Sequence, residues 1–128
     1  MNFTCEVVER APADARALIE LARDGARREW TFGAVADGAR RLAGRLHALG
    51  VRRGDVVLTL VGNRPEWALT MLACFRQGYV VLPCTEQLRA KDLALRLAVA
   101  QPRLVVADRR NADVLQGWAG RDAVGAVR

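Results

Sequence analysis

The feature that most constrains the fold is a set of three short apolar runs, separated from one another by stretches of helical periodicity. The runs are residues 55–61, 79–82 and 104–107. They are rich in Val and Leu throughout, which is typical of strands that are buried on both faces of a sheet. Because a helix-length segment lies between successive runs, right-handed β–α–β crossovers are expected. We therefore predict an α/β fold, with a three-layer parallel sheet.

Helix signals occupy the intervals between these runs. Asn63 and Glu66, with Pro65 between them, predict a capping box at the start of a helix that reaches Arg76 and ends at Gly78. The remaining expected elements are an edge strand or ordered arm over 1–9, a helix over 13–23, a β-like run over 30–32, an amphipathic helix over 33–49 ended by Gly50, a helix over 90–100, and a last helix over 111–118.

Length and composition place the chain among ordinary globular domains. It has 128 residues, of which 52% are hydrophobic and 27% charged, so one domain with a real core is expected. No run approaches the roughly 20 apolar residues that cross a bilayer, and no secretory signal is visible. The net charge of +6 is spread along the chain and forms no basic stripe. We therefore predict a cytoplasmic protein with no membrane span and no nucleic-acid partner.

Residue usage excludes two kinds of chemistry. The three cysteines, Cys5, Cys74 and Cys84, form no C-x-x-C pair, and His47 is the single histidine. Because a zinc site needs four ligands at characteristic spacings, we predict that the thiols are structural and that no metal is bound. The sequence contains no serine, which excludes a hydrolase with a serine nucleophile.

The carboxyl ends of the predicted strands are the natural place for a ligand site in a parallel sheet. These ends, at residues 62–63, 83–85 and 108–109, carry no glycine-rich phosphate motif. Nothing in the sequence brings the nearby carboxylates Glu86, Asp92 and Asp108 together as an acid/base pair. No catalytic residue is therefore predicted. The other polar or aromatic candidates are interpreted as surface residues (His47, Lys91), core residues (Trp67, Met71) and a turn (117–120).

A receiver-like phosphoacceptor domain is one alternative of similar length and element order. It needs acidic residues after its first strand and a lysine after its last strand. Asp55 instead begins its strand, and Lys91 follows no strand. The residues therefore disfavour this alternative.

Several segments in order resemble the N-terminal part of the adenylate-forming enzymes, the superfamily of AMP-dependent synthetases and ligases. The resemblance covers about residues 28–110. Within the superfamily, residues 64–67 and 83–93 most resemble the medium-chain acyl-CoA synthetases. The matching segments are 30–35 (WTFGAV), 43–46 (AGRL), 49–57 (LGVRRGDVV), 63–67 (NRPEW), 76–83 (RQGYVVLP) and 104–108 (LVVAD).

The resemblance implies a ligase of fatty acid metabolism. Such enzymes activate a carboxylic acid with Mg·ATP to an acyl-adenylate and then transfer the acyl group to coenzyme A. The family's phosphate loop, adenine- and ribose-binding segments and lid lysine lie downstream of the matching region. The resemblance therefore implies that residues 1–128 are an N-terminal subdomain that ends before the phosphate loop and is inactive alone, with 1–27 and 111–128 matched less well.

The resemblance also bears on ligands and partners. Arg89 and Arg109 lie near segments that approach the coenzyme A nucleotide in some relatives, and arginine suits phosphate. The expected partner is the remainder of the synthetase, with self-association through exposed apolar surface as a second possibility. A non-catalytic binding or scaffold module that kept the fold is the alternative function.

Overall fold

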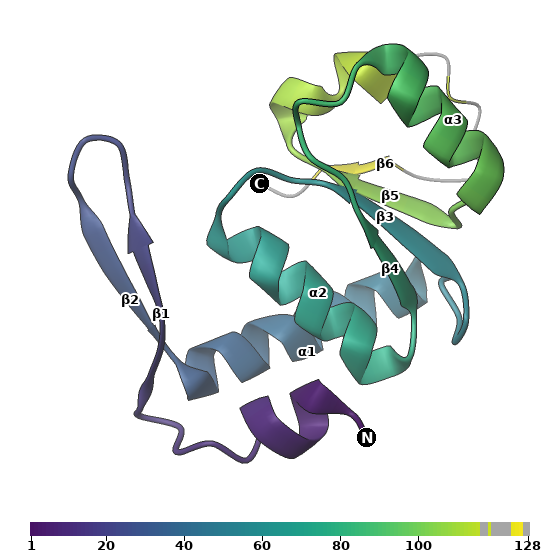
Figure 1. The fold of residues 1–128 in the computed structure, drawn as a ribbon. Helices are drawn as coiled ribbons and strands as arrows, with labels where there is room; N and C mark the ends of the chain where they lie inside the picture. Colours follow the sequence, from purple (N-terminus) through teal and green to yellow (C-terminus); the bar gives the residue numbers. More distant parts are fainter. Residues whose placement is uncertain (116–117, 119–123, 127–128) are drawn as a thin grey trace.

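The computed structural model describes residues 1–115, 118 and 124–126, and its centre is a four-stranded sheet (Figure 1). The strand order is β4-β3-β5-β6, and each neighbouring pair is parallel. The three predicted strands and the α/β class are therefore confirmed. The strands are β3 (Val56–Leu60), β4 (Val80–Pro83), β5 (Leu104–Ala107) and β6 (Val124–Ala126).

Three helices flank the sheet and make it the middle of three layers: α1 (Phe32–Ala48), α2 (Pro65–Gln77) and α3 (Ala90–Ala100). Side chains alternate between the two faces of a strand, so Val57 packs with Leu46 of α1 and Cys74 of α2, whereas Leu58 packs with Leu93 of α3. The helices predicted for these segments are confirmed. In the part of the chain that the structure describes, no helix combines the length and the apolar character needed to cross a membrane.

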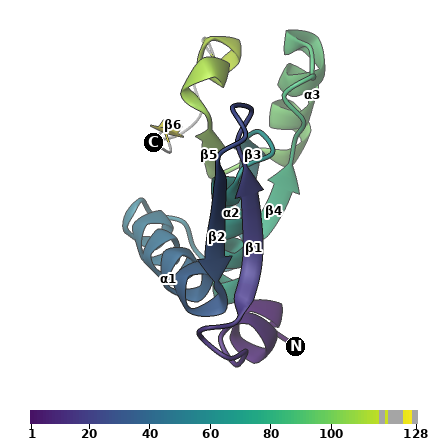
Figure 2. The same cartoon turned by 90° about the vertical axis from the view of Figure 1, so that its left-hand side faces the viewer.

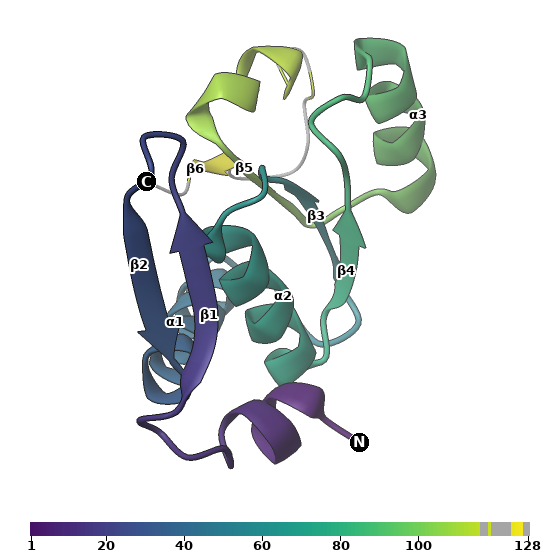
Figure 3. The same ribbon diagram turned by 60° about the vertical axis from the view of Figure 1, so that its left-hand side comes forward.

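The first 31 residues differ from the prediction. The helix predicted over 13–23 is wrong, because β1 (Arg16–Leu21) and β2 (Arg27–Thr31) form an antiparallel hairpin that stands beside α1 and α2 (Figures 2 and 3). Gly25, with φ of 88°, lies in the hairpin turn. Leu21 of β1 is 72% exposed, so this apolar residue does not contribute to the core.

The N-terminal segment forms η1 (Thr4–Val8), one π-helical turn, rather than an edge strand. The Asn2 side chain donates hydrogen bonds to the carbonyl oxygens of Phe75 and Arg76, both at 3.1 Å. The Thr4 hydroxyl donates to the carbonyl of Leu72 at 2.8 Å. These contacts hold the segment against the C-terminal part of α2. The second expectation for residues 1–9, an ordered arm, is therefore confirmed.

Three further predictions are corrected. The capping box is wrong, because Arg64 occupies the N-cap position of α2 without a side-chain capping bond, and Glu66 pairs with Arg64 instead. Strand β4 is not buried on both faces, since it lies at the sheet edge and Val80 is 52% exposed. The helix predicted over 111–118 is replaced, within the described residues, by two 3-10 turns. These are η2 (Arg109–Asn111) and η3 (Asp113–Leu115), and residues 116–117 lie outside the description.

Candidate functional site

The carboxyl ends of β3, β4 and β5 lie at one edge of the sheet, and each is followed by polar residues. The parallel register places Leu60 of β3 beside Ala107 of β5, and Thr59 beside Pro83 of β4. The loops that leave these positions therefore meet, as the sequence predicted. Their contacts define the candidate site, which we build from its two carboxylates upward.

Asp108 is the buried carboxylate of this edge, with only 3% of its surface exposed. It accepts a hydrogen bond from the backbone N–H of Gly62 at 2.9 Å, and it forms an ion pair with Arg64 at 2.8 Å. A buried charge is tolerated when it is paired and hydrogen-bonded. Asp108 thus joins the end of β5 to the β3–α2 loop. Hydrogen bonding to Glu66, reinforced by the charges of Glu66 and Asp108, outweighs desolvation and raises the pKa of Arg64.

Glu86 is the second carboxylate, and it comes from the loop between β4 and α3. Arg110 of η2 binds both of its oxygens, at 2.7 and 2.6 Å, in the two-pronged geometry that suits a guanidinium group. The Asn111 amide donates to Glu86 at 2.8 Å and to the carbonyl of Leu60 at 3.0 Å. Arg110 also approaches Asp108 at 3.7 Å, so the two carboxylates share one arginine. We call Arg64, Glu86, Asp108, Arg110 and Asn111 the strand-edge network.

Gly62 allows this network to close over the end of β3. A Cβ atom at this position would lie 2.5 Å from Oε2 of Glu86 and would also collide with Arg110. Non-bonded carbon and oxygen atoms do not approach so closely, so any side chain here would displace the Glu86–Arg110 pair. The pairing of Glu86 with Arg110 as the structure shows it therefore depends on the absence of a side chain at residue 62.

Both carboxylates at this edge take part in ion pairs. Arg64 binds Asp108, and Arg110 binds Glu86. Within residues 1–115, 118 and 124–126, no three His, Cys, Asp or Glu side chains gather in a way that could hold a metal ion. We assign no reaction step to the described residues.

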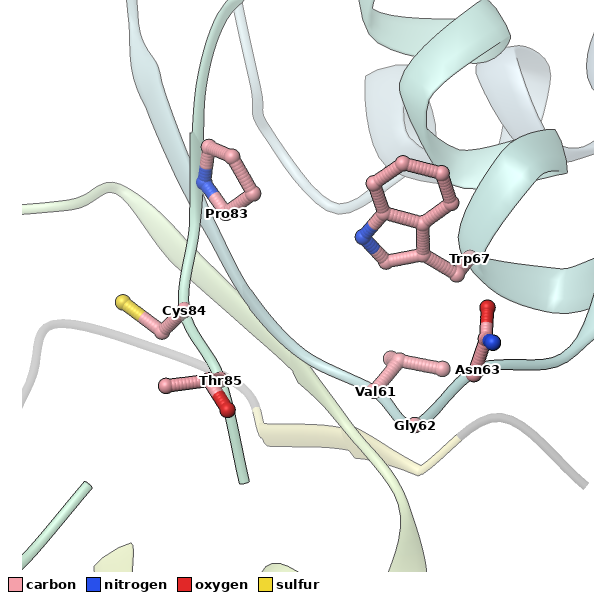
Figure 4. Close-up of a pocket in the computed structure, with 7 residues that line it drawn as sticks. All are labelled: Val61, Gly62, Asn63, Trp67, Pro83, Cys84 and Thr85. Carbon is pink, nitrogen blue, oxygen red and sulfur yellow. The ribbon is translucent and has the colours of Figure 1, made fainter. Parts of the chain in front are cut away.

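Beside the strand-edge network, a groove of about 280 Å³ opens between α2 and β4 (Figure 4). Trp67 of α2 and Pro83 of β4 form opposite walls, with Val61 between them. Trp67 is 37% exposed, so its interpretation as a core residue is wrong. The remaining lining residues are Gly62, Asn63, Cys84 and Thr85.

The cysteines behave as structural thiols where the structure tests them. Cys74 is fully buried, and desolvation raises its pKa to about 12. Desolvation likewise raises the pKa of Cys84, against a smaller opposing effect of Arg96. Figure 4 shows the Cys84 sulfur pointing away from Trp67 and Pro83, and the side chain packs on the α3 face of the sheet. A thiol that stays protonated is a poor nucleophile.

The structure separates the other residues singled out in the sequence. Arg89 is exposed at the N-cap of α3 and pairs with Asp92 at 3.4 Å, so Asp92 lies outside the strand-edge network. Arg109 is exposed at the start of η2. His47 and Lys91 are exposed, as predicted.

Sequence reasoning missed Arg110 and Asn111, as well as the steric role of Gly62. The positions of these three residues could have indicated them, because each residue lies within four positions of the carboxyl end of a predicted strand. Sequence alone did not show that Glu86 and Asp108 would face the same arginine, since the pairing spans 24 residues along the chain.

Comparison with known proteins gives consistent relatives. Residues 5–127 match the family model described as AMP-binding enzyme. The chain is 37% identical over 79 residues to the acyl-coenzyme A synthetase ACSM5, mitochondrial, of Rattus norvegicus, which covers 61% of this chain and 14% of the relative. It is 34% identical over 117 residues to ACSM2, mitochondrial, of the same organism, covering 83% and 20%. The chain therefore spans about 14–20% of the length of these relatives.

Solved structures agree in fold. The crystal structure of the Brucella canis acyl-CoA synthetase superposes with a TM-score of 0.88 at 25% identity, over 98% of this chain and 23% of that one. ATP-bound MatB from Rhodopseudomonas palustris superposes with a TM-score of 0.78 at 23% identity, over 89% of this chain and 22% of that one. The second likeness is one of fold alone.

Proposed function

The chain belongs to the AMP-binding enzyme family, and on this premise we propose that it forms the N-terminal part of an acyl-CoA synthetase. The observation that carries the proposal is the family match over residues 5–127, together with the superposition of 98% of the chain on an acyl-CoA synthetase. The whole enzyme would join a carboxylic acid to ATP with Mg, releasing pyrophosphate. The coenzyme A thiol would then displace AMP from the acyl-adenylate.

In this enzyme the present chain would serve as a scaffold. Its sheet and strand-edge network would hold one side of the large domain, while the reactive groups would come from the rest of the polypeptide. Residues 1–128 alone are then inactive, in keeping with the two carboxylates that arginines already bind.

A chimera tests this role directly. Residues 5–127 would replace the superposing segment of the Brucella canis acyl-CoA synthetase, and carboxylate-dependent exchange of pyrophosphate into ATP would be measured. The chimera should retain exchange, whereas the isolated chain should show none. A matched chimera with Gly62→Leu should have a lower Tm, because the new side chain displaces the paired ends of Glu86 and Arg110.

Two outcomes would refute the proposal. The first is a folded chimera that binds ATP without any exchange, which would mean that this chain does not replace the synthetase scaffold. The second is exchange by the isolated chain, which would place the reactive groups within it. The alternative, a non-catalytic binding or scaffold module, gains support from the first outcome.

Arg89 and Arg109 stay candidates for the coenzyme A side of the enzyme. In the active chimera, Arg109→Ala should raise KM for coenzyme A and leave KM for ATP unchanged. Arg89→Ala should have the smaller effect, because Asp92 already pairs with this guanidinium. Equal changes in both KM values would contradict a role on the coenzyme A side.

The remainder of the synthetase is the partner we propose for the exposed apolar side chains. Leu95 and Val99 on α3 are 63% and 78% exposed, which leaves one stripe of this helix uncovered. The isolated chain should therefore self-associate in sedimentation experiments, and Leu95→Gln with Val99→Gln should reduce this association. We also expect a cytoplasmic location, which cell fractionation would test.

A further inference from the structure

The amino ends of the parallel strands form a second edge of the sheet, opposite the strand-edge network. Strand β3 begins here after the loop that follows α1, and β4 begins here after the end of α2. The N–H of Gly54 donates to the carbonyl of Gly78, and that of Val80 to the carbonyl of Asp55, both at 2.9 Å. Figures 1 and 3 show the N-terminal segment at this same end of the molecule.

Large apolar side chains are exposed at this end. Leu49 follows α1, Phe75 lies in the last turn of α2, and Val80 begins β4. Phe3 of the N-terminal segment is exposed as well, and its neighbour Asn2 binds the carbonyl of Phe75. Single exposed apolar residues are common on proteins, but four at one end of the molecule favour a contact surface.

Arginines without an acidic partner lie at the same end. The Arg53 side chain crosses Gly78, since a Cβ atom added at that glycine would lie 3.3 Å from its Cγ and Nη1 atoms. Arg52 and Arg103 donate to backbone carbonyls at the end of α1, at 2.8 and 3.4 Å. Among the described residues, no carboxylate pairs with any of these three guanidinium groups.

The carboxylates of this end are fewer than its arginines, and they are already bound. Asp55 accepts the backbone N–H of Arg52 at 2.7 Å, Glu9 pairs with Arg76 at 2.8 Å, and Glu6 accepts a backbone N–H of the N-terminal segment at 2.8 Å. These three oppose five arginines, which leaves an excess of two positive charges. The arginines are Arg45, Arg52, Arg53, Arg76 and Arg103.

An anionic lipid surface suits this combination. Its headgroups supply negative charge at every position, and the boundary with the acyl chains accepts apolar side chains without matching their shape. The whole chain carries a net charge of +6, which attracts it to such a surface. A second copy of the chain would bring the same excess of arginines. Single-stranded RNA would stack on aromatic rings but not on Leu49 or Val80.

We propose that the chain docks on anionic lipid bilayers through the amino ends of its parallel strands. The apolar side chains enter the headgroup region, and the arginines bind lipid phosphates. Such docking needs no spanning helix and does not depend on the function proposed above. We call the docking residues the amino-end surface, and they are Phe3, Leu49, Arg52, Arg53, Phe75 and Val80.

Flotation with vesicles tests the proposal, because lipid carries bound protein upward while unbound or self-associated protein stays below. Vesicles of equal parts phosphatidylglycerol and phosphatidylcholine would be compared with vesicles of phosphatidylcholine alone. We expect the chain to float only with the anionic vesicles, and rising sodium chloride should release it because salt screens the arginines. Equal flotation with both vesicles would overturn the role of charge, and no flotation would overturn the proposal.

Two variants with matched controls locate the contact. Arg53→Gln should weaken binding to the anionic vesicles about fivefold, and Leu49→Gln about fivefold or more. The controls are Arg23→Gln and Leu21→Gln, which make the same changes at exposed positions of the β1–β2 hairpin. Figure 1 shows the hairpin turn far from the N-terminal segment. The controls should leave binding unchanged, and losses equal to those of the variants would overturn the assignment to the amino-end surface.

A nitroxide-labelled lipid gives a readout that needs no variant. In anionic bicelles it should broaden the amide NMR signals of Leu49, Arg53 and Val80 and leave that of Gly25 sharp. The reverse pattern would overturn the proposed orientation. Oligouridylate that binds more tightly than the anionic vesicles would overturn a lipid partner in favour of RNA. None of these results bears on pyrophosphate exchange by the chimera, so this proposal and the proposed function fail separately.

Discussion

The parallel sheet and the β1–β2 hairpin bury their apolar side chains to very different degrees. Val57 and Leu58 in β3 have no exposed surface, whereas Ile19 and Leu21 in β1 are 40% and 72% exposed. The hairpin is held by strand pairing, by surface ion pairs and by Trp30, which packs toward α1. Both regions have regular hydrogen bonding between strands, but only the parallel sheet buries its apolar side chains. The stability of the fold therefore depends more on this burial than on the presence of paired strands.

The strongest test of this comparison removes the same side chain from both regions. Leu58→Ala should lower the free energy of unfolding by about 3–4 kcal/mol, because it leaves a cavity between the sheet and α3. Leu21→Ala should change it by less than about 0.5 kcal/mol, since the residue already contacts water. Urea denaturation of both variants provides the measurement. Similar losses would mean that the hairpin belongs to the cooperative core.

The same difference explains which parts of the fold the sequence predicts. In β3 and β5, apolar pattern, burial and strand propensity agree, so the strands were predicted correctly. In β1, the apolar residues at 17, 18 and 21 have helical spacing, but pairing with β2 overrides it. Such pairing joins residues that lie 6 to 15 positions apart, and the periodicity of one segment does not contain this information.

The candidate site was predictable only as a location. Parallel topology placed the strand ends together, and the structure confirms that edge. The pairing of Glu86 with Arg110, and the exposure of Trp67, depend on the loop path after each strand. Loop paths follow from tertiary packing rather than from residue type, so these features could not be derived from the sequence.

Removal of one carboxylate charge at the sheet edge and one in the hairpin compares the same two regions, with a smaller expected effect. Asp108→Asn should cost about 2–3 kcal/mol of unfolding free energy, because the buried carboxylate holds Gly62 and Arg64. Glu29→Gln removes an exposed partner of Arg16 and Arg27 in the hairpin and should leave the Tm unchanged. Thermal unfolding at low and high salt checks both, and a larger loss in the hairpin variant would reverse the comparison.

Alkaline pH should weaken the sheet layer through Cys74. Its folded pKa of about 12 lies above the ordinary value of 9.0, because burial disfavours the thiolate. A raised pKa contributes stability that is complete below pH 9 and is lost as pH rises toward 12, because the unfolded thiol ionises first. At pH 10 the loss should be about 1–2 kcal/mol.

Cys74→Ala isolates this contribution. Its free energy of unfolding should fall less between pH 8 and pH 10 than that of the unmodified chain, as measured by urea denaturation at each pH. Burial also raises the pKa of Tyr79, with a smaller contribution from the charge of Cys74, so the Tyr79 contribution that comes from burial is present in both proteins. Parallel pH profiles would show that the thiol does not take part.

The smallest expected effect has opposite signs at two buried threonines, Thr4 in η1 and Thr59 in β3. Thr4 and Thr59 are both fully buried, but the Thr4 hydroxyl binds the carbonyl of Leu72, whereas the Thr59 hydroxyl has no partner in the described residues. Replacement by valine keeps the shape of each side chain. Thr4→Val should cost about 1 kcal/mol, and Thr59→Val should stabilise the chain by about 1 kcal/mol. Destabilisation by both would mean that the Thr59 hydroxyl has a hydrogen-bond partner in the folded chain, such as a water molecule.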